Sequence, residues 1–553
     1  RFLAQATFGV TSVDIARLRA VGYEAWLDEQ FAAPVSTQVP YLNWVSQLPD
    51  EPDNHVNYHA PKQSWWINAV GSPDPSRGNV RPTDQLRQRV AFALSEIFVI
   101  STSNGTLIYQ PWGLASYYDL LSTDAFGNYR ALLEDVTLHP SMGIFLSMIG
   151  NQKPDPSRNI RPDENYAREV MQLFSVGLHQ LNIDGSRKLS GGQPIPTYDQ
   201  NVVRGMASVL TGWNWNNIGC GAASYTCCDS NTYTNCGPYE YQDPRWLHPM
   251  QPVQSFHDSQ SNKQLLNYPG VALPGGMLSA GGDAQSDLAA ALDNIFLHPN
   301  VGPFIARRLI QRLVTSNPSP PYIERVSRVF NDDGSSAHLR GNLQAVVKAI
   351  LLDPEARYGH LQAPDTFGKL REPLLKLSHY WRAMDATSIN GRIKSTYPDW
   401  MERYGQAALR SPSVFNFFRP DFRQQGEITA LGMTSPEFQI LTASLATDTP
   451  DDLFMQVFCY FTGSDACWFA GHVDTMAANL DRDAALAESN PAQLLDTYNL
   501  LFMSGQMSPH MRQVILDQMA TVQNRPPNFT RGRARAMHAL YLILNSPEYS
   551  IQK

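Results

Sequence analysis

The chain lacks the features that identify several large classes of protein. It contains no run of 18 or more apolar residues, the minimum for a helix that spans a membrane, so we expect no membrane span. Its 43 Lys and Arg residues are outnumbered by 51 Asp and Glu residues, giving a net charge of −8. This deficit argues against nucleic acid as a partner, because phosphate binding requires a basic surface. A short basic run, Arg307, Arg308 and Arg312, is interpreted as one face of a helix.

Several catalytic signatures are also missing. No G-x-S-x-G, P-loop or G-x-G-x-x-G pattern stands between a predicted strand and a helix, which argues against α/β serine hydrolases, nucleotide hydrolases and dinucleotide oxidoreductases. No H-E-x-x-H, H-x-x-E-H or E-x-x-H pattern is present to organise metal ligands. We therefore predict no cofactor and no metal. The alternative is a metal ion held by Glu164, Glu169, His257 and Asp258.

Cysteine is scarce, and its distribution bears on the cellular compartment. Four of the six cysteines lie in a loop-like segment and two flank a Gly-Ser-Asp turn; these are Cys220, Cys227, Cys228 and Cys236, then Cys459 and Cys467. An even number in loops favours disulfides and export to the periplasm or the extracellular space. We predict a Cys459–Cys467 bridge and leave the pairing of the other four open. Zinc is the competing explanation, although the cluster lacks C-x2-C spacing. Because Arg1 opens no signal-peptide pattern, we expect a mature or trimmed chain.

Helical periodicity is abundant, and it predicts a mainly α fold. Two segments, 134–146 and 292–305, each end a helix on Leu-His-Pro and start another, since proline closes one helix and suits the first turn of the next. His139 and His298 are interpreted as caps at these turns. We predict a multi-helical array of packed helix pairs with a small β-hairpin insertion and long disulfide-tied loops. The aromatic segment 411–422, SPSVFNFFRPDF, is either a wedge into the core or a cleft wall.

Composition divides the chain into five predicted regions. They are an N-terminal helical hairpin at 1–32, a loop-rich surface excursion at 33–83, a central helical region at 84–213 with a β-hairpin at 181–198, a Cys-rich long loop at 214–280, and a C-terminal helical region at 281–553. Asp-Gly and Gly-Gly turns predict the hairpin.

The densest set of ionisable side chains lies on one predicted helix within 162–178, PDENYAREVMQLFSVGL. An apolar stripe at helical spacing faces the core, formed by Ala167, Val170, Met171, Phe174 and Leu178. Glu164 and Arg168 are four residues apart on the flank of this stripe and should form a partly desolvated ion pair. Asn165 and Glu169 point away from the stripe. Because Glu164 and Glu169 are about 140° apart around the helix, one helix cannot present both to one substrate atom.

A second concentration of reactive side chains occurs in the long loop, at His257-Asp258-Ser-Gln-Ser-Asn-Lys263. Long loops within compact domains are often functional. We predict that this segment faces the charged side of the 162–178 helix around an opening that admits a ligand. The predicted catalytic residues are Glu164, Glu169, His257 and Asp258, and the predicted ligand-binding residues are Asn165, Tyr166, Arg168, Trp213 and Lys263.

Seven motifs, in order along nearly the whole chain, resemble those of a known bacterial family. They are LAQATFG with WLDEQF, LRQRVAFALSEIFV, ENYAREVMQLFSVGL, VRGMASVLTGW, HDSQSNK, LHPNVGPFIARRLIQRLV and SPSVFNFFRPDF. This set resembles the family known as domain of unknown function 1800. Asp163 stands where that family usually has Asn, whereas Glu164, Asn165, Arg168 and Glu169 match. The resemblance implies an exported protein with a sulfatase-fold protein as partner, and it implies no reaction.

Two classes of function fit these residues. The first is an enzyme that cleaves a polysaccharide, an oligosaccharide or another extracellular polymer by hydrolase or lyase chemistry, with Glu164 or Glu169 opposite Asp258 and His257. The second is a non-catalytic extracellular scaffold or partner-binding protein, whose motif residues form a buried polar network that fixes helix register. Convergence of the motif residues on a solvent-reaching cavity would favour the enzyme. A sealed and mutually paired set would favour the scaffold.

Overall fold

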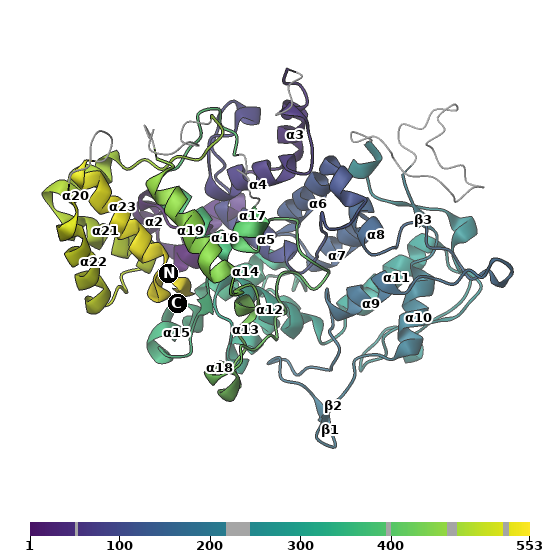
Figure 1. The fold of residues 1–553 in the computed structure, drawn as a ribbon. Coiled ribbons are helices and arrows are strands. Elements are labelled where there is room, and N and C mark those ends of the chain that lie inside the picture. The colour runs from purple at the N-terminus through teal and green to yellow at the C-terminus, as the bar shows by residue number, and fades with distance from the viewer. Residues whose placement is uncertain (50–53, 217–243, 394–399, 462–472, 524–529) are drawn as a thin grey trace.

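Helices dominate the computed structural model, which describes residues 1–49, 54–216, 244–393, 400–461, 473–523 and 530–553 (Figure 1). Within these ranges the mainly α prediction is confirmed, and strands occur only as four two-stranded antiparallel sheets. No helix in the described part of the chain has the length and apolarity that a bilayer crossing requires.

The N-terminal quarter is a set of short helices. It contains α1 (Phe2–Ala6), α2 (Ser12–Ala32), α3 (Val39–Val45), α4 (Ala60–Val70), α5 (Gln85–Ser95), α6 (Pro111–Asp124), α7 (Tyr129–Leu138) and α8 (Pro140–Phe145). The Thr11 side chain accepts the Asp14 N–H at the start of α2, and Gly22, at φ 82° and ψ 176°, breaks α2 into two helices. The first 32 residues therefore form the helix–turn–helix that their capping pattern and glycine predict.

Segment 33–83 differs from the predicted surface excursion. It contains α4, all of whose residues are buried, and Trp66 packs edge-on against Trp381 with ring centroids 4.8 Å apart. A helix enclosed on every side needs no polar face, so its sequence shows no amphipathic period. That is why the sequence did not reveal α4.

Two helix pairs turn at the Leu-His-Pro segments. α7 leads into α8, and α11 (Ala284–Phe296) leads into α12 (Val301–Leu313). His139 Nδ1 accepts the Ser141 N–H at 3.2 Å, and His298 Nδ1 accepts the Asn300 N–H at 3.0 Å. His139 is therefore the N-cap of α8, as predicted. His298 is not a cap residue, because the N-cap of α12 is Asn300, whose N–H His298 accepts.

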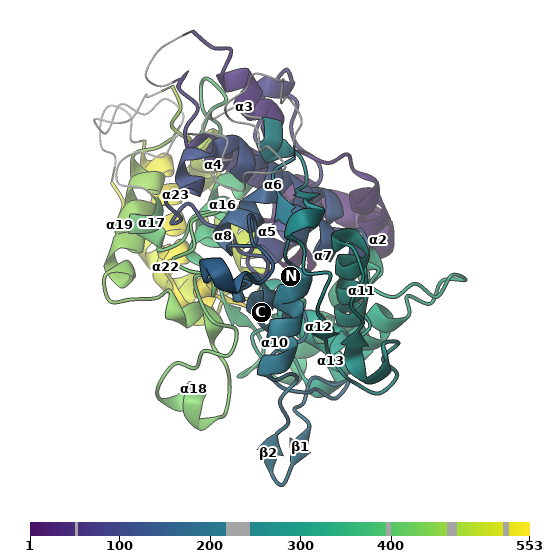
Figure 2. The same ribbon diagram turned by 90° about the vertical axis from the view of Figure 1, so that its right-hand side faces the viewer.

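The middle of the chain carries three of the small sheets. Its elements are α9 (Asn165–Gln172), β1 (Leu189–Ser190), β2 (Gln193–Pro194), α10 (Gln200–Val209), β3 (Trp213–Asn214), β4 (Gln251–Pro252), β5 (Lys263–Gln264) and β6 (Met277–Leu278). β1 pairs with β2, β3 with β4, and β5 with β6. The β1–β2 hairpin lies within the predicted range 181–198 and projects from the body of the molecule (Figures 1 and 2).

Helices continue to the C-terminal end. They are α13 (Pro320–Asn331), α14 (Leu343–Leu352), α15 (Pro354–Gln362), α16 (Pro373–Ala383), α17 (Trp400–Tyr404), α18 (Glu427–Ala430), α19 (Leu445–Phe458), α20 (Asp481–Ser489), α21 (Pro491–Met503), α22 (Pro509–Thr521), α23 (Arg531–Leu544) and α24 (Pro547–Ser550). The final sheet pairs β7 (Lys369–Leu370) with β8 (Ile551–Gln552).

Only one of the six cysteines lies among the described residues. Cys459 is buried and is not a free thiol. Cys467 and the cluster Cys220, Cys227, Cys228 and Cys236 lie outside the described residues. The disulfide-tied loops are therefore not part of the fold described, and the Cys459–Cys467 pairing stays a prediction.

Candidate functional site

The 164–169 motif forms a closed ring of hydrogen bonds at the protein surface. Glu164 is the N-cap residue of α9, and its Oε2 accepts Arg168 Nη2 at 2.5 Å. Gln200, the first residue of α10, donates from Nε2 to both Glu164 oxygens at 2.9 and 3.0 Å and accepts Arg168 Nη2 at 2.8 Å. We call these three side chains the surface ring. The Arg168 and Glu164 side chains are 44% and 31% exposed, so their ion pair is well solvated.

The Gln200 hydrogen bonds also favour the ionised form of Glu164. Hydrogen bonding from Gln200, followed by hydrogen bonding and charge from Arg168, lowers the pKa of Glu164. A carboxyl held in this way stays ionised at neutral pH and is a hydrogen-bond acceptor rather than an acid.

Glu169 occupies a different environment from the one predicted. It is half-buried, and its Oε2 is enclosed without a hydrogen-bond partner among the described residues. Burial raises the pKa of Glu169, and Arg168 partly opposes this. Tyr198 lies close by, and burial together with the Glu169 charge raises the pKa of its hydroxyl to about 12. Glu164 is thus the outer carboxyl and Glu169 the inner one, and the Glu169 charge acts on Tyr198 in the segment that leads into α10.

The neighbouring predicted ligand-binding residues divide between surface and interior. Asn165 is exposed, and its N–H donates to Asp163 Oδ1 at 2.7 Å. Tyr166 is buried, and its hydroxyl lies 2.7 Å from Thr137 Oγ1. Trp213 in β3 is also buried. In this structure neither aromatic side chain is available to a ligand from solvent.

The second motif, 257–263, is sealed in the interior. His257 and Lys263 have no exposed side-chain surface, and both contact Asp287, which lies in the first turn of α11. His257 Nε2 lies 3.0 Å from Asp287 Oδ2, and Lys263 Nζ lies 2.8 Å from the same oxygen. On the other side of the ring, His257 Nδ1 lies 2.9 Å from the Thr211 carbonyl oxygen. We call His257, Lys263 and Asp287 the sealed triad.

Asp258 and two glycines complete the enclosure. Asp258 Oδ1 accepts the N–H groups of Gln260 and Ser261, both at 3.2 Å, which fixes the turn that follows. A Cβ on Gly282 would lie 1.9 Å from Asp287 Oδ1, and one on Gly212 would lie 2.9 Å from the His257 backbone nitrogen. No larger residue fits at either glycine, so the backbone itself closes over the triad.

The two motifs do not share the opening that was predicted. The surface ring meets α10 at its first residue, Gln200, whereas His257 meets the chain at Thr211, beyond the last residue of α10. A helix of this length rises about 15 Å between its ends. The predicted catalytic set is thus divided, with Glu164 and Glu169 near solvent and His257 and Asp258 inside.

A larger group of buried charges was missed by the sequence interpretation. Lys369 Nζ lies 3.2 Å from Glu372 Oε1 and 3.0 Å from Glu437 Oε1. Arg312 Nε lies 3.4 Å from Glu96 Oε2. The Arg312 carbonyl oxygen accepts hydrogen bonds from Lys369 Nζ at 2.8 Å and Arg89 Nη2 at 2.7 Å. We call these six residues the ionic cluster: Arg89, Glu96, Arg312, Lys369, Glu372 and Glu437.

Burial and neighbouring charge separate the pKa values of two acids in the ionic cluster. Burial raises the pKa of Glu96 to about 8, with Arg312 in partial opposition. Burial would also raise that of Glu372, but Lys369, Arg89 and Arg312 hold it at about 2. The cluster therefore places a carboxyl that holds its proton at neutral pH beside one that has lost it, an arrangement that acid–base catalysts also use.

Three of the family-like motifs meet at this cluster. α5 supplies Arg89, the residue that caps its C-terminal end is Glu96, and α12 supplies Arg312. From segment 411–422, Asn416 Nδ2 lies 3.4 Å from Glu96 Oε1 and the Phe418 ring centroid lies 4.3 Å from Arg312 Cζ, so this segment is a wedge into the core. Arg312 is buried, so the basic run lies on one helix, α12, but does not form a uniform solvent-exposed surface. The available signal was charge on strongly apolar helices.

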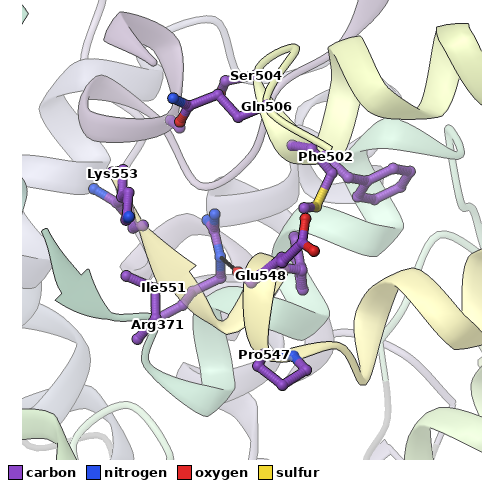
Figure 3. A pocket seen from close by; sticks show the side chains of 12 residues that line it. Arg371, Phe502, Ser504, Gln506, Pro547, Glu548, Ile551 and Lys553 are labelled. Carbon is purple, nitrogen blue, oxygen red and sulfur yellow. Dashed lines mark hydrogen bonds between the residues drawn. The ribbon is translucent and has the colours of Figure 1, made fainter. Parts of the chain in front are cut away.

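A pocket of 360 Å³, lined by none of the residues of the ring, the triad or the ionic cluster, lies where the two ends of the chain meet (Figure 3). Arg371, Phe502, Gln506 and Glu548 are among its lining residues, and none of the predicted site residues is. Over the described ranges, no group of three or more His, Cys, Asp or Glu side chains is placed to hold a metal ion.

Comparison with known proteins identifies a family and no activity. Neither a curated protein nor a solved structure matches the chain. The sequence profile described as "Protein of unknown function (DUF1800)" matches residues 1–551, which is essentially the whole chain. The protein therefore belongs to the DUF1800 family.

Proposed function

We propose that this protein is an exported, non-catalytic binding protein for an extracellular polysaccharide, in which the 257–263 motif has a structural role. The sealed triad is the observation that carries the proposal. Two of the residues predicted to line a cleft, His257 and Lys263, are fully buried and satisfied by Asp287. Buried groups paired in this way fix helix register without access to substrate.

The surface ring supplies a binding feature. Its three side chains come from two helices and hold one another in place, so a sugar hydroxyl would meet donors and acceptors that are already ordered. Preordered polar groups lose little entropy on binding, which favours affinity. A sulfatase-fold protein is the alternative partner, and co-purification from the native host would identify it.

A second candidate function is supported by Glu169. An enclosed carboxyl oxygen without a partner, together with a raised pKa, is what a general acid requires. In this alternative the protein is a hydrolase or lyase, with Glu169 as the acid and the ionised Glu164 nearby.

One experiment separates the two candidates. Wild type, Glu164→Gln and Glu169→Gln are incubated with a panel of bacterial, algal and plant polysaccharides, and both binding and release of new chain ends are measured. The proposal predicts binding without turnover in all three proteins. Turnover that falls at least about 100-fold in Glu169→Gln would replace it with the enzyme. Glu324→Gln is the matched control, because Glu324 forms the same exposed i,i+4 pair with Arg328 on α13.

Export is a separate part of the proposal and has its own test. It is supported by the grouping of the cysteines and by Cys459 not being a free thiol. We expect peptide mapping of unreduced protein from its host to show Cys459 joined to Cys467. Free thiols at both positions would contradict export to an oxidising compartment.

A further inference from the structure

Arg187, at the base of the β1–β2 hairpin, lies within electrostatic reach of Arg307 on α12, and Arg308 follows Arg307 on the same helix. The hairpin base is fixed to α12 by the Leu181 N–H, which donates to Asn300 Oδ1 at 2.9 Å. A Cβ on Gly185 would lie 3.6 Å from Arg307 Nε. We call Arg187, Arg307 and Arg308 the basic face. In Figure 2 the hairpin projects below α12 and α13.

The charges of the basic face act on one another. Burial, and then Arg187, lowers the pKa of Arg307. Burial, and then Arg312 and Arg307, lowers that of Arg308 to about 9. Arg187 therefore repels Arg307, Arg307 repels Arg308, and a bound anion would relieve this repulsion.

No acid of the described chain pairs with these arginines. Within the described ranges, Arg187, Arg307 and Arg308 form no salt bridge, and their side chains donate no hydrogen bond. Two acids lie within electrostatic reach. Asp184 raises the pKa of Arg307, but its Oδ1 already accepts hydrogen bonds from the N–H and the hydroxyl of Ser186. Asp421 raises the pKa of Arg308, but it is exposed to solvent.

The adjacent helix shows that such pairing is available elsewhere on this surface. On α13, Arg325 Nε lies 2.7 Å from Asp353 Oδ2 and Arg328 Nη2 lies 2.6 Å from Glu324 Oε1. The Arg308 guanidinium instead lies over the phenyl ring of Phe304, with 4.8 Å between Arg308 Cζ and the ring centroid. Stacking on an aromatic ring orients a guanidinium and leaves its N–H groups free for an oxyanion.

We propose that the basic face binds the carboxylate or sulfate groups of an acidic extracellular polysaccharide. This inference rests on the proposed binding function and names the class of polymer. Guanidinium groups bind carboxylate and sulfate with paired, charge-assisted hydrogen bonds. Duplex DNA, which carries one charge per about 1.7 Å, is the competing polyanion, and its binding is measured beside that of the charged polymers.

The test compares charged and neutral polymers. Binding of polygalacturonate, dextran sulfate and neutral dextran is measured by calorimetry at low and high salt. The proteins are wild type, Arg307→Gln/Arg308→Gln, and the control Arg328→Gln, which also removes a positive charge from this region. We expect wild type to prefer a charged polymer, and the double variant to bind it at least about tenfold more weakly with a smaller salt dependence. The control should change affinity less than about twofold.

The outcomes separate this inference from the proposed function. If the double variant is folded by circular dichroism and binds a charged polymer as wild type does, the basic face is not the binding site, and the polysaccharide-binding proposal still stands. Equal affinity of wild type for neutral dextran and the charged polymers also contradicts anion binding by the basic face and leaves the polysaccharide-binding proposal standing. Tighter binding of duplex DNA than of either charged polymer overturns the polymer class. Binding to no polysaccharide in the wider panel overturns both proposals.

Discussion

The surface ring and the sealed triad contain the same kinds of side chain in opposite environments. In the ring, Glu164 and Arg168 are 31% and 44% exposed, whereas in the triad Lys263 and Asp287 are 0% and 3% exposed. The ring can exchange its partners for water or a ligand at little cost. The triad cannot, because each charge would be left in a medium of low dielectric. A charged motif in a sequence is thus equally compatible with a binding surface and with a structural core.

The difference arises from a residue outside both motifs. Asp287 lies 24 residues beyond Lys263 on a separate helix, and it satisfies both His257 and Lys263. Without it, a histidine, an aspartate and a lysine within seven positions resemble a catalytic group. With it, they form a closed ionic contact that fastens the long loop to α11.

The largest effect should come from removing the shared acceptor of the triad. Asp287→Ala leaves Lys263 and His257 buried without their carboxylate, so we expect a loss of about 3–5 kcal/mol in the free energy of unfolding. Thermal and denaturant unfolding followed by circular dichroism measure it. A loss below about 1 kcal/mol would show that the triad is not the structural contact described, and the contrast with the ring would fail.

A double substitution tests whether the unpaired charge causes that loss. Lys263→Met/Asp287→Leu replaces the ion pair with apolar side chains, and we expect it to recover stability relative to Asp287→Ala alone. A loss equal to the sum of two single substitutions would instead indicate a packing defect.

The ionic cluster should respond to pH at Glu96. Its pKa is raised from 4.5 to about 8, so folding favours the protonated form and the stability that this proton provides is lost as pH rises from about 4.5 to 8. Glu96→Gln cannot ionise. Its stability relative to wild type should therefore improve by roughly 1–3 kcal/mol between pH 5 and pH 8. Glu372 does not interfere, because its pKa of about 2 places its titration below this window.

The measurement is the difference between the two unfolding curves across that range. Other acids with raised pKa values, such as Asp119 at about 7, are present in both proteins and cancel in the difference. A difference that is constant with pH would contradict the protonated state of Glu96.

The smallest effect should come from the surface ring. Arg168→Ala breaks an exposed ion pair and one bond to Gln200, for which we expect less than about 1 kcal/mol of destabilisation. Thermal unfolding at low and high salt measures it, with Arg328→Ala on α13 as the matched exposed pair. A loss as large as that of Asp287→Ala would erase the contrast between ring and triad.

Local signals in the sequence predicted much of the helical framework. The stripe of α9 is a case, since Ala167, Val170, Met171 and Phe174 are buried as their spacing predicts. Only Leu178, which lies beyond the end of α9, departs from it, at 50% exposed. These features depend on residues close in sequence, which is why the periodicity was sufficient.

Features that depend on contacts between distant segments could not be predicted from the sequence. Glu169 is half-buried and within electrostatic reach of Tyr198 on a later segment, and the ionic cluster joins residues from Arg89 to Glu437. Helical spacing shows which side of a helix is polar and cannot show which other element covers that side. The candidate site was therefore predicted as residues on helices and loops, and its division between surface and interior was not.

The β7–β8 sheet has a consequence for how the chain folds. Lys369, which supplies a cation to the ionic cluster, is paired with Gln552, so an interior contact depends on backbone synthesised 183 residues later. Pairings so distant in sequence close slowly, because a long loop must be ordered first. Folding during synthesis would consequently leave these charged groups uncovered until β8 has been made, and this interval is when a chaperone would be needed most.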